Sequence, residues 1–401
     1  MGSEMCIRDR FNTNYPKAAL PVAEVVSSTQ TETTRRSDLR IAIVSDAILG
    51  RNGVGTYYPD LLTHIQPRVS EARLFSPSVK PNRTLESFAI PLPGDKTQRL
   101  AWPKKRELYA QLGALDPTLI VIPSLGMFSF FALRYASKNA IPLIIVNHTD
   151  FDHLLSLYWP FWLSRPFRQI LAKIYRWLYD KAVGVGVMNA KEEQKARQDG
   201  ACLVQIMATP LDPEFLTHPI QPIKGAINRV IFIGRLAPEK GINEILNAAH
   251  SLPRMHFTII GDGPLRDQVQ NAAKTCQNLS YLGWLPRKRV REEIDAAHIL
   301  VLPSAYETFG TVALEALARE RFVVVSEGCG ISKWPSLASG IFMMSHEVSL
   351  TKTLSGITRQ SLEDRDRHAQ QSWRAVREFN EKAISDWLDF FVKATSPRRP
   401  N

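Results

Sequence analysis

Short apolar runs alternate with amphipathic stretches along most of this chain. The runs have the length of buried strands, and the stretches between them repeat apolar residues at the three- and four-residue spacing of a helix. Strands that alternate with helices favour an α/β fold built on parallel sheets. We predict strands at residues 40–45, 72–75, 118–122, 142–146, 183–187 and 205–207, and again at 229–233, 257–260, 280–282, 299–302 and 322–325.

The strands fall into two similar sets, separated by a proline-rich stretch at residues 209–222. Proline clusters interrupt regular structure, so this stretch is interpreted as a linker. We therefore expect two Rossmann-like α/β domains that face each other across a cleft. Helices are predicted at residues 242–251 and 264–274, for example, and a charged helix over 361–394. The expected boundaries are 39–215 for the first domain, 216–375 for the second and 376–401 for a C-terminal helix and tail.

Residues 1–38 do not follow this pattern. Residues 5–10, Met-Cys-Ile-Arg-Asp-Arg, resemble the translation of a sequencing adaptor, so residues 1–10 are interpreted as an assembly artefact. Residues 11–38 are aperiodic and rich in Ser and Thr, which is typical of a disordered segment. The predicted domains therefore begin near residue 39.

Composition narrows the class of protein. With 401 residues, 44% hydrophobic and 22% charged, the chain can build two full globular cores. No run of about 18 apolar residues predicts a membrane-spanning helix. The formal net charge of +11 suits an anionic membrane or small molecule, and no nucleic-acid-binding module accompanies it. Four scattered cysteines without metal-ligand spacing indicate free thiols and a cytoplasmic location.

The most specific motif is residues 303–318, which follow a predicted strand and open a helix near Gly310. Free N–H groups at a helix start favour an anion, and we expect those of Thr311 and Val312 to meet phosphate. Glu307 and Glu315 stand near the same start. Either acid alone is explained by the helix dipole. Two acids beside an anion site suit a ligand that carries phosphate and hydroxyls, as a nucleotide-sugar does.

The whole string resembles the Glu-x7-Glu segment of retaining GT-B glycosyltransferases, the large glycosyltransferase family 4, also called glycosyl transferases group 1. The resemblance implies the GT-B fold, with the acceptor on the first domain and the nucleotide-sugar on the second. It also implies that Glu307 contacts sugar hydroxyls and Glu315 the ribose, and that Phe309 and Gly310 help to bind the donor.

A second motif lies at residues 233–241, Ile-Gly-Arg-Leu-Ala-Pro-Glu-Lys-Gly, directly after the first predicted strand of the second half. An isolated charged turn is usually a surface turn. This one is similar to the family's Gly-Arg-Leu-x-x-Glu-Lys-Gly run, which implies that Arg235 and Lys240 hold the donor diphosphate and stabilise the departing nucleotide. Gly261, in the family-like segment 260–264, is interpreted equally as a donor contact or as a plain strand-to-helix turn.

The first half contributes a glycine loop and a histidine. Gly53, Val54 and Gly55 lie in a loop that lacks the Gly-x-Gly-x-x-Gly spacing of dinucleotide-binding proteins. It is either a tight turn or, as the resemblance implies, a loop that brings backbone amides near the donor. His148 and Asp150 belong to His-Thr-Asp-Phe, a string similar to lipid-glycosylating members. By that analogy His148 contacts the donor and acts in catalysis, and Asp150 serves the acceptor side, although a lone histidine is more often structural.

Aromatic residues interleave with Lys and Arg over residues 158–177. This mixture suits a membrane interface, and core packing of an amphipathic helix explains part of it equally well. Together with the positive charge, the pattern favours peripheral docking on the cytoplasmic face of an anionic membrane.

We therefore expect a retaining glycosyltransferase that moves a sugar from a UDP- or GDP-type donor to an acceptor hydroxyl, on a membrane lipid or a bacterial cell-envelope glycan precursor. The resemblance implies no metal and no cofactor. Two alternatives remain open: a nucleotide-sugar 2-epimerase of the same fold, and a binder of sugar nucleotides without catalysis. The intact Arg235, Lys240, Glu307 and Glu315 argue against the second.

Overall fold

The structure is a computed structural model, and it describes residues 36–50, 53–78, 85–92, 95–123, 125–148, 161–345 and 348–396. Almost all of the expected N-terminal segment, residues 1–38, lies outside this part of the chain, and so does Asp150.

The first domain is built on a parallel six-stranded sheet with the strand order β2-β1-β5-β6-β7-β8. The central strands are buried on both faces because helices cover both sides of the sheet. The strands are β1 (Arg40–Val44), β2 (Glu71–Phe75), β5 (Leu119–Ile122), β6 (Leu143–Asn147), β7 (Gly184–Val187) and β8 (Val204–Ile206). The helices are α2 (Gly53–Ile65), η1 (Gln66–Arg68), α3 (Lys105–Leu115), α4 (Met127–Lys138), α6 (Phe161–Lys181) and α7 (Ala190–Gln198).

The second domain repeats this plan, with the strand order β11-β10-β9-β12-β13-β14, again all parallel. A short helix, α8 (Pro213–Thr217), lies in the linker. The strands are β9 (Arg229–Ile233), β10 (His256–Ile260), β11 (Leu279–Gly283), β12 (Ile299–Leu302), β13 (Phe322–Ser326) and β14 (Ile341–Met344). The helices are η2 (Pro238–Lys240), α9 (Ile242–Ser251), α10 (Arg266–Thr275), α11 (Arg287–Ala296), α12 (Thr311–Ala318), η3 (Gly330–Lys333), η4 (Pro335–Gly340) and α13 (Leu350–Ile357).

The fold class expected from the sequence, two α/β domains facing each other, is confirmed, and each predicted strand is present. The predictions missed β14 and an antiparallel hairpin of β3 (Glu86–Leu92) and β4 (Asp95–Pro103). The hairpin was missed because β3 contains Pro91 and β4 begins with a polar run, so neither shows the apolar signature of a buried strand.

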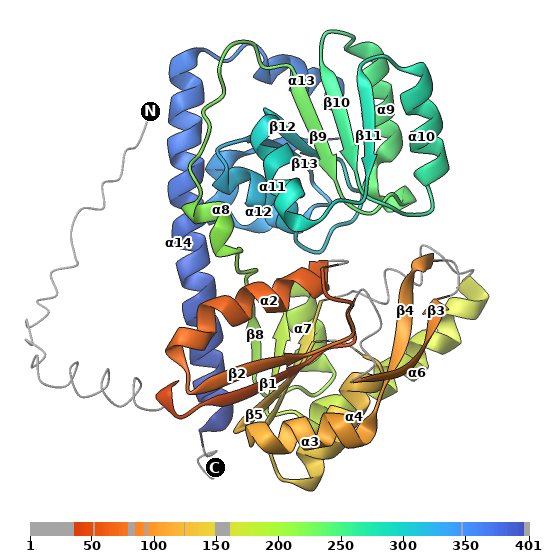
Figure 1. The fold of residues 1–401 in the computed structure, drawn as a ribbon, viewed down its shortest axis with the longest axis vertical. Helices are drawn as coiled ribbons and strands as arrows, with labels where there is room; N and C mark the ends of the chain where they lie inside the picture. The colour runs from red at the N-terminus through yellow and green to blue at the C-terminus, as the bar shows by residue number, and fades with distance from the viewer. Residues whose placement is uncertain are drawn as a thin grey trace, which may run out of the picture.

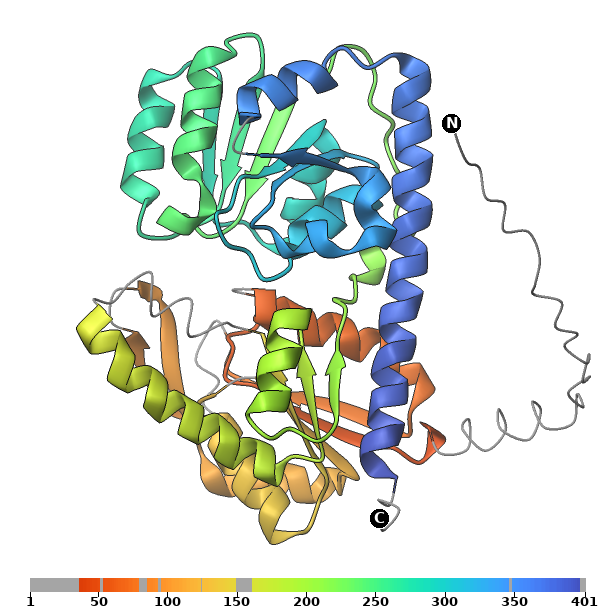
Figure 2. The ribbon, with the colours of Figure 1, turned by 180° about the vertical axis from the view of Figure 1, so that it is seen from behind.

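One helix, α14 (Leu362–Thr395), runs along both domains (Figures 1 and 2). Its earlier part supplies Val376, Phe379 and Ala383 to the core of the second domain. Its later part supplies Trp387, among others, to the core of the first domain. The expected boundary at residues 375 and 376 falls inside this continuous helix. Neither α14 nor any other helix of the described residues is long and apolar enough to cross a membrane.

Trp387 is the largest side chain that α14 buries. It is fully buried, and its Nε1 donates a hydrogen bond of 2.9 Å to the Tyr57 hydroxyl of α2. We expect Trp387→Ala to lower the free energy of unfolding by about 3–5 kcal/mol, because the cavity cannot refill completely. Denaturant unfolding followed by circular dichroism measures this change.

Trp373, on the same helix, is half-buried and packs against the Arg377 guanidinium. Trp373→Ala is therefore the matched control, and we expect it to cost clearly less than Trp387→Ala. Equal losses in the two variants would contradict the assignment of Trp387 to the core of the first domain.

Candidate functional site

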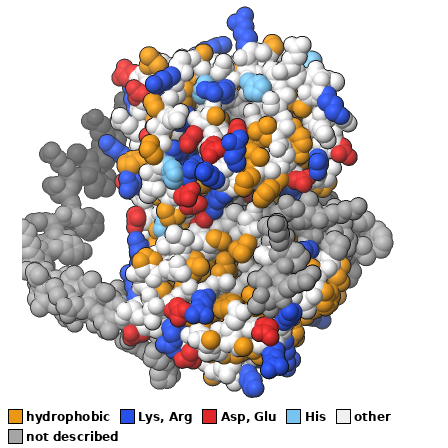
Figure 3. All heavy atoms as spheres, viewed as in Figure 1, with side chains coloured by type: hydrophobic (Ala, Val, Ile, Leu, Met, Phe, Trp, Pro, Cys, Tyr) orange, Lys and Arg blue, Asp and Glu red, His pale blue; other side chains and the backbone are white. Residues whose placement is uncertain are grey.

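A cavity of about 520 Å³ lies between the two domains. Its walls are the start of α2 and the end of β6 on one side, and on the other the loops after β9, β10 and β12 with the start of α12. These are carboxyl ends of parallel strands, where α/β proteins place ligand sites. Figure 3 shows side chains of both charges gathered on the second domain beside its boundary with the first.

The cavity brings together most residues that the sequence analysis singled out. Gly55 is the exception within the described chain, because it is buried inside α2 and does not line the cavity. Asp150 lies outside the described residues. The lining includes Gly53, Val54, His148, Arg235, Lys240, Gly261, Glu307, Phe309, Gly310, Thr311, Val312 and Glu315.

Two loops of the second domain are pressed together at this edge of the sheet. Gly241 adopts a left-handed conformation with φ of 66°, and a Cβ there would lie 2.1 Å from the Pro303 carbonyl oxygen. Only glycine fits such a close approach. The Ala305 N–H donates a 2.8 Å hydrogen bond to the Glu239 carbonyl. The loop after β9 is therefore fixed against the loop after β12.

This packing places a lysine against a glutamate. Lys240 Nζ lies 2.5 Å from Glu307 Oε2, and both side chains are mostly buried. The backbone of Glu307 is fixed separately, because its N–H donates to the Gly328 carbonyl and its carbonyl accepts from the Gly330 N–H. Arg235 lies nearby and forms a longer ion pair of 3.6 Å with Glu239. The site thus holds two cations from the loop after β9 and an oriented acid from the loop after β12.

The start of α12 faces the same cavity. Gly310 is the N-cap residue, with φ of 95°, and as a glycine it has no side chain that could cap the helix. Thr311 and Val312, the first residues of α12, line the cavity. Uncapped N–H groups at a helix start attract anions. This end of α12 can therefore bind a phosphate group that enters the cavity.

His148 directly follows β6 and lines the cavity from the first domain. Its Nε2 lies 2.6 Å from the Tyr58 hydroxyl of α2. Burial lowers the pKa of His148 to about 3. The imidazole is therefore neutral at physiological pH, and it can exchange hydrogen bonds with a ligand without adding charge.

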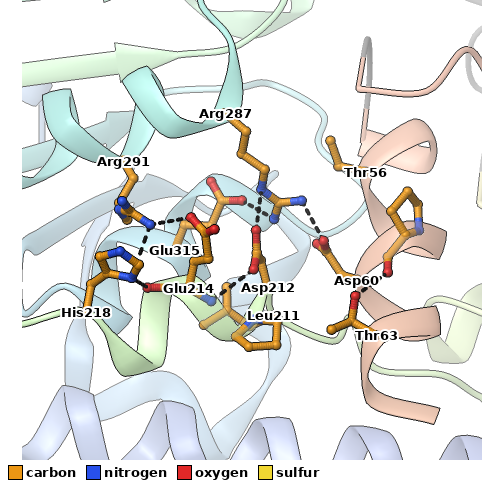
Figure 4. Close-up of polar contacts among 12 residues, drawn as sticks. Thr56, Asp60, Thr63, Leu211, Asp212, Glu214, His218, Arg287, Arg291 and Glu315 are labelled. Carbon is orange, nitrogen blue, oxygen red and sulfur yellow. Dashed lines mark hydrogen bonds and ion pairs between the residues drawn. The ribbon is translucent and has the colours of Figure 1, made fainter. Parts of the chain in front are cut away.

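Sequence reasoning missed Arg287, the first residue of α11, which also lines the cavity. Figure 4 shows its guanidinium between three acids: Asp60 of α2, Asp212 at the start of α8 and Glu315 of α12. One signal could have identified it. An arginine at a helix N-terminus opposes the helix dipole, so its presence there calls for another explanation.

Within the described ranges, no group of three or more His, Cys, Asp or Glu side chains is placed to hold a metal ion. The expectation that the protein uses no metal and no cofactor stays a prediction.

Two family models match consecutive parts of the chain. The family described as Glycosyltransferase Family 4 matches residues 51–214, and Glycosyl transferases group 1 matches residues 216–334. The two matches meet in the linker, at residue 215.

Curated relatives are distant. Sulfoquinovosyl transferase SQD2 of Arabidopsis thaliana is 24% identical over 258 residues, which are 62% of this chain and 50% of that protein. A GDP-mannose-dependent alpha-mannosyltransferase of Mycobacterium tuberculosis is 26% identical over 309 residues, 73% of this chain and 80% of that protein. The alpha-D-kanosaminyltransferase of Streptomyces kanamyceticus is 32% identical over 111 residues, 26% of this chain and 29% of that protein. The chain thus spans half or less of the length of two of these three.

Solved structures share the fold. Sucrose-phosphate synthase from Thermosynechococcus elongatus has a TM-score of 0.64 at 16% identity, covering 88% of this chain and 97% of that one. HepE from Anabaena, solved in complex with UDP and glucose, has a TM-score of 0.59 at 14% identity, covering 88% and 99%. The two family models match the two domains in the order in which the chain carries them. The chain therefore belongs to the GT-B fold glycosyltransferases that join a family 4 domain to a group 1 domain.

Proposed function

We propose that this protein is a retaining glycosyltransferase that moves a sugar from a UDP- or GDP-type donor to an acceptor hydroxyl. One observation carries the proposal: a single cavity holds Lys240, the uncapped start of α12, Glu307 and Glu315. The lysine and the helix start suit a diphosphate, and the two acids suit hydroxyl groups of a sugar and a ribose. Arg235 joins Lys240 on the diphosphate side.

The same groups suit the chemistry of transfer. As the bond between the anomeric carbon and the phosphate oxygen breaks, negative charge develops on the departing diphosphate. Lys240, Arg235 and the amides of α12 stabilise that charge. The acceptor oxygen attacks the same face of the sugar, and its proton passes to the phosphate oxygen, so configuration is retained. This route needs no enzymic nucleophile, no metal and no cofactor.

The Lys240–Glu307 pair suits a site that must accept a charged ligand. Each charged group is mostly removed from water and offsets the other. A diphosphate would give Lys240 a new partner and release Glu307 to the sugar hydroxyls. The neutral His148, with the first-turn residues Gly53 and Val54 of α2, would contact the same sugar from the first domain.

The proposal extends to a lipid acceptor at an anionic membrane, because α6 carries an apolar stripe on its outer side. Ile170, Ile174 and Trp177 follow helical spacing and are 54%, 41% and 48% exposed. Lys173 and Lys181 are exposed beside the stripe. An apolar stripe flanked by cations is typical of a helix that lies in a membrane interface. In Figure 2, α6 runs along the outside of the first domain, away from the second domain.

Lys240→Ala and Glu307→Ala test the site directly. We expect either change to lower the rate of transfer by about 10²- to 10³-fold, or about 2.7–4 kcal/mol of barrier, because each removes a group placed against developing charge or the sugar. Thermal shift with UDP, GDP and their sugars first identifies the donor, because a ligand that binds the folded state raises the melting temperature. Release of UDP or GDP in the presence of acceptor lipids then measures the rate.

Lys274→Ala, which changes an exposed lysine on α10, is the matched control and should leave the rate unchanged. Full turnover in both site variants would contradict the assignment of the site. Conversion of the donor sugar to its epimer without any acceptor would instead favour the 2-epimerase alternative.

Ile174→Glu tests membrane docking. We expect the natural chain to float with vesicles that contain phosphatidylglycerol and to bind pure phosphatidylcholine vesicles more weakly, because cations flank the stripe. The variant should lose most of this binding, since it places a charge in the apolar stripe. Leu362→Glu changes an apolar residue at the start of α14 that is more exposed than Ile174, and it should bind like the natural chain. Equal binding of both variants would contradict docking through α6.

A further inference from the structure

A cluster of four charged side chains joins the two domains beside the cavity (Figure 4). Arg287 Nη1 donates to Asp60 Oδ1 at 2.6 Å, and Nη2 donates to Glu315 Oε1 at 2.8 Å. Its Nε lies 3.4 Å from Asp212 Oδ2. Asp60 belongs to the first domain and Asp212 to the linker, whereas Arg287 and Glu315 belong to the second domain. One guanidinium therefore connects the three parts of the molecule.

Arg287 fixes the orientation of the Glu315 carboxylate. It engages only one of the two carboxylate oxygens, Oε1. The other oxygen, Oε2, has no hydrogen-bond partner among the described residues, and the side chain lines the cavity. A carboxylate with one oxygen bound and the other turned to a cavity can accept a hydrogen bond from a ligand hydroxyl.

Asp60 holds Arg287 from the opposite domain. It lies on α2, whose first turn lines the cavity, but Asp60 is not itself among the lining residues. Asp60 can therefore act on a ligand in the cavity only through a neighbour, and Arg287 is the neighbour that reaches both.

Stability alone does not explain the cluster. Three carboxylates share one guanidinium, and Asp60 Oδ2 is buried without a hydrogen-bond partner in the described part of the chain. Burial of unbalanced charge is costly, and an arginine at the start of α11 opposes the helix dipole. An arrangement that costs stability at the edge of a ligand cavity points to a role in binding.

We propose that Arg287 is a positioning residue that couples donor recognition to the arrangement of the domains. It holds Glu315 ready for the ribose of the donor, and Asp60 holds Arg287 in place from the first domain. The inference rests on the proposed function, because it requires a nucleotide in the cavity with its ribose at Glu315. Through Asp60, the position of the first domain thereby affects the donor site in the second domain.

The first experiment measures how strongly the protein discriminates between nucleotides with and without ribose hydroxyls. Calorimetry with UDP and GDP identifies which one the natural chain binds more tightly, and the 2′,3′-dideoxy form of that nucleotide is the comparison. We expect the natural chain to prefer the ribonucleotide by about tenfold or more, the size of one charge-assisted hydrogen bond. In Arg287→Met that preference should shrink to about twofold or less, because Glu315 loses its orientation.

Further variants separate positioning from a general effect on the fold. Asp60→Ala should reduce the same preference about threefold. The double variant Asp60→Ala with Arg287→Met should show the same preference as Arg287→Met alone. Arg287→Lys keeps the charge but not the fork, and it should fall between the natural chain and Arg287→Met. Because these readouts are ratios of affinities for one variant, a change in stability alone does not move them.

Arg291→Met is the matched control. Arg291 lies one turn further along α11, is also buried, and pairs with Glu214 and His218 of the linker region, but it does not line the cavity. It should keep the natural preference.

An unchanged preference in Arg287→Met or Asp60→Ala, or additive effects in the double variant, would overturn the inference. If Arg287→Met does not fold, the preferences of Asp60→Ala and Arg287→Lys decide whether the inference holds. Failure of the natural chain to bind either nucleotide would instead refute the proposed function, and this inference with it.

The second experiment tests the unbalanced charge. Burial raises the pKa of Asp60 to about 7, with Arg287 opposing the rise and Asp212 and Glu315 adding to it. Between the ordinary pKa of 3.8 and about 7, the folded protein keeps a proton on Asp60 that the unfolded chain has lost. The contribution of Asp60 to stability is therefore lost as pH rises through this window.

Asn at position 60 cannot titrate, and it keeps one oxygen that accepts from Arg287. We therefore expect the melting temperature of Asp60→Asn, minus that of the natural chain, to be larger at pH 8 than at pH 5. Scanning calorimetry measures both temperatures. A difference in melting temperature that stays constant, or that shrinks with rising pH, would contradict the claim that the cluster carries more acid than its arginine balances.

Discussion

The close approach of two loops at the edge of the second sheet is the constraint on which the site depends. Gly241 packs directly against the Pro303 carbonyl, and the Glu239 carbonyl accepts from the Ala305 N–H. Side chains that follow different strands are thereby brought into contact, and Lys240 meets Glu307. Parallel strands deliver both loops to the same edge, and a glycine with positive φ permits the final approach. The charge pattern of the site follows from this backbone contact.

The first domain shapes the site from across the crevice, and two features hold it there. Helix α14 shares its apolar face between the two cores and buries Trp387 in the first domain. Such burial is non-directional and fixes the domains without specifying a ligand. The Arg287 cluster is directional, because each nitrogen of its fork meets a separate acid. Packing therefore keeps the domains together, while the charged cluster links their arrangement to the contents of the cavity.

Much of the fold and of the candidate site could be predicted from the sequence, because both depend largely on short, contiguous stretches of residues. Buried parallel strands leave continuous apolar runs, and the residues around Lys240 and Glu307 are contiguous motifs. Gly55 does not line the cavity, because α2 begins at Gly53 and turns Gly55 into its buried face. Arg287 was missed because its partners Glu315 and Asp60 are 28 and 227 residues away in sequence. Only the assembled domains bring these charges together.

In the proposed complex, a diphosphate lies between Lys240, Arg235 and the start of α12, with acids on either side that contact the sugar and the ribose. A crystal structure of the protein with UDP or GDP tests it most directly. We expect phosphate oxygens within hydrogen-bond distance of Lys240 and of the Thr311 or Val312 N–H, and ribose hydroxyls at Glu315. A nucleotide bound outside this cavity, or bound in it with its phosphates turned away from Lys240 and α12, would contradict this arrangement.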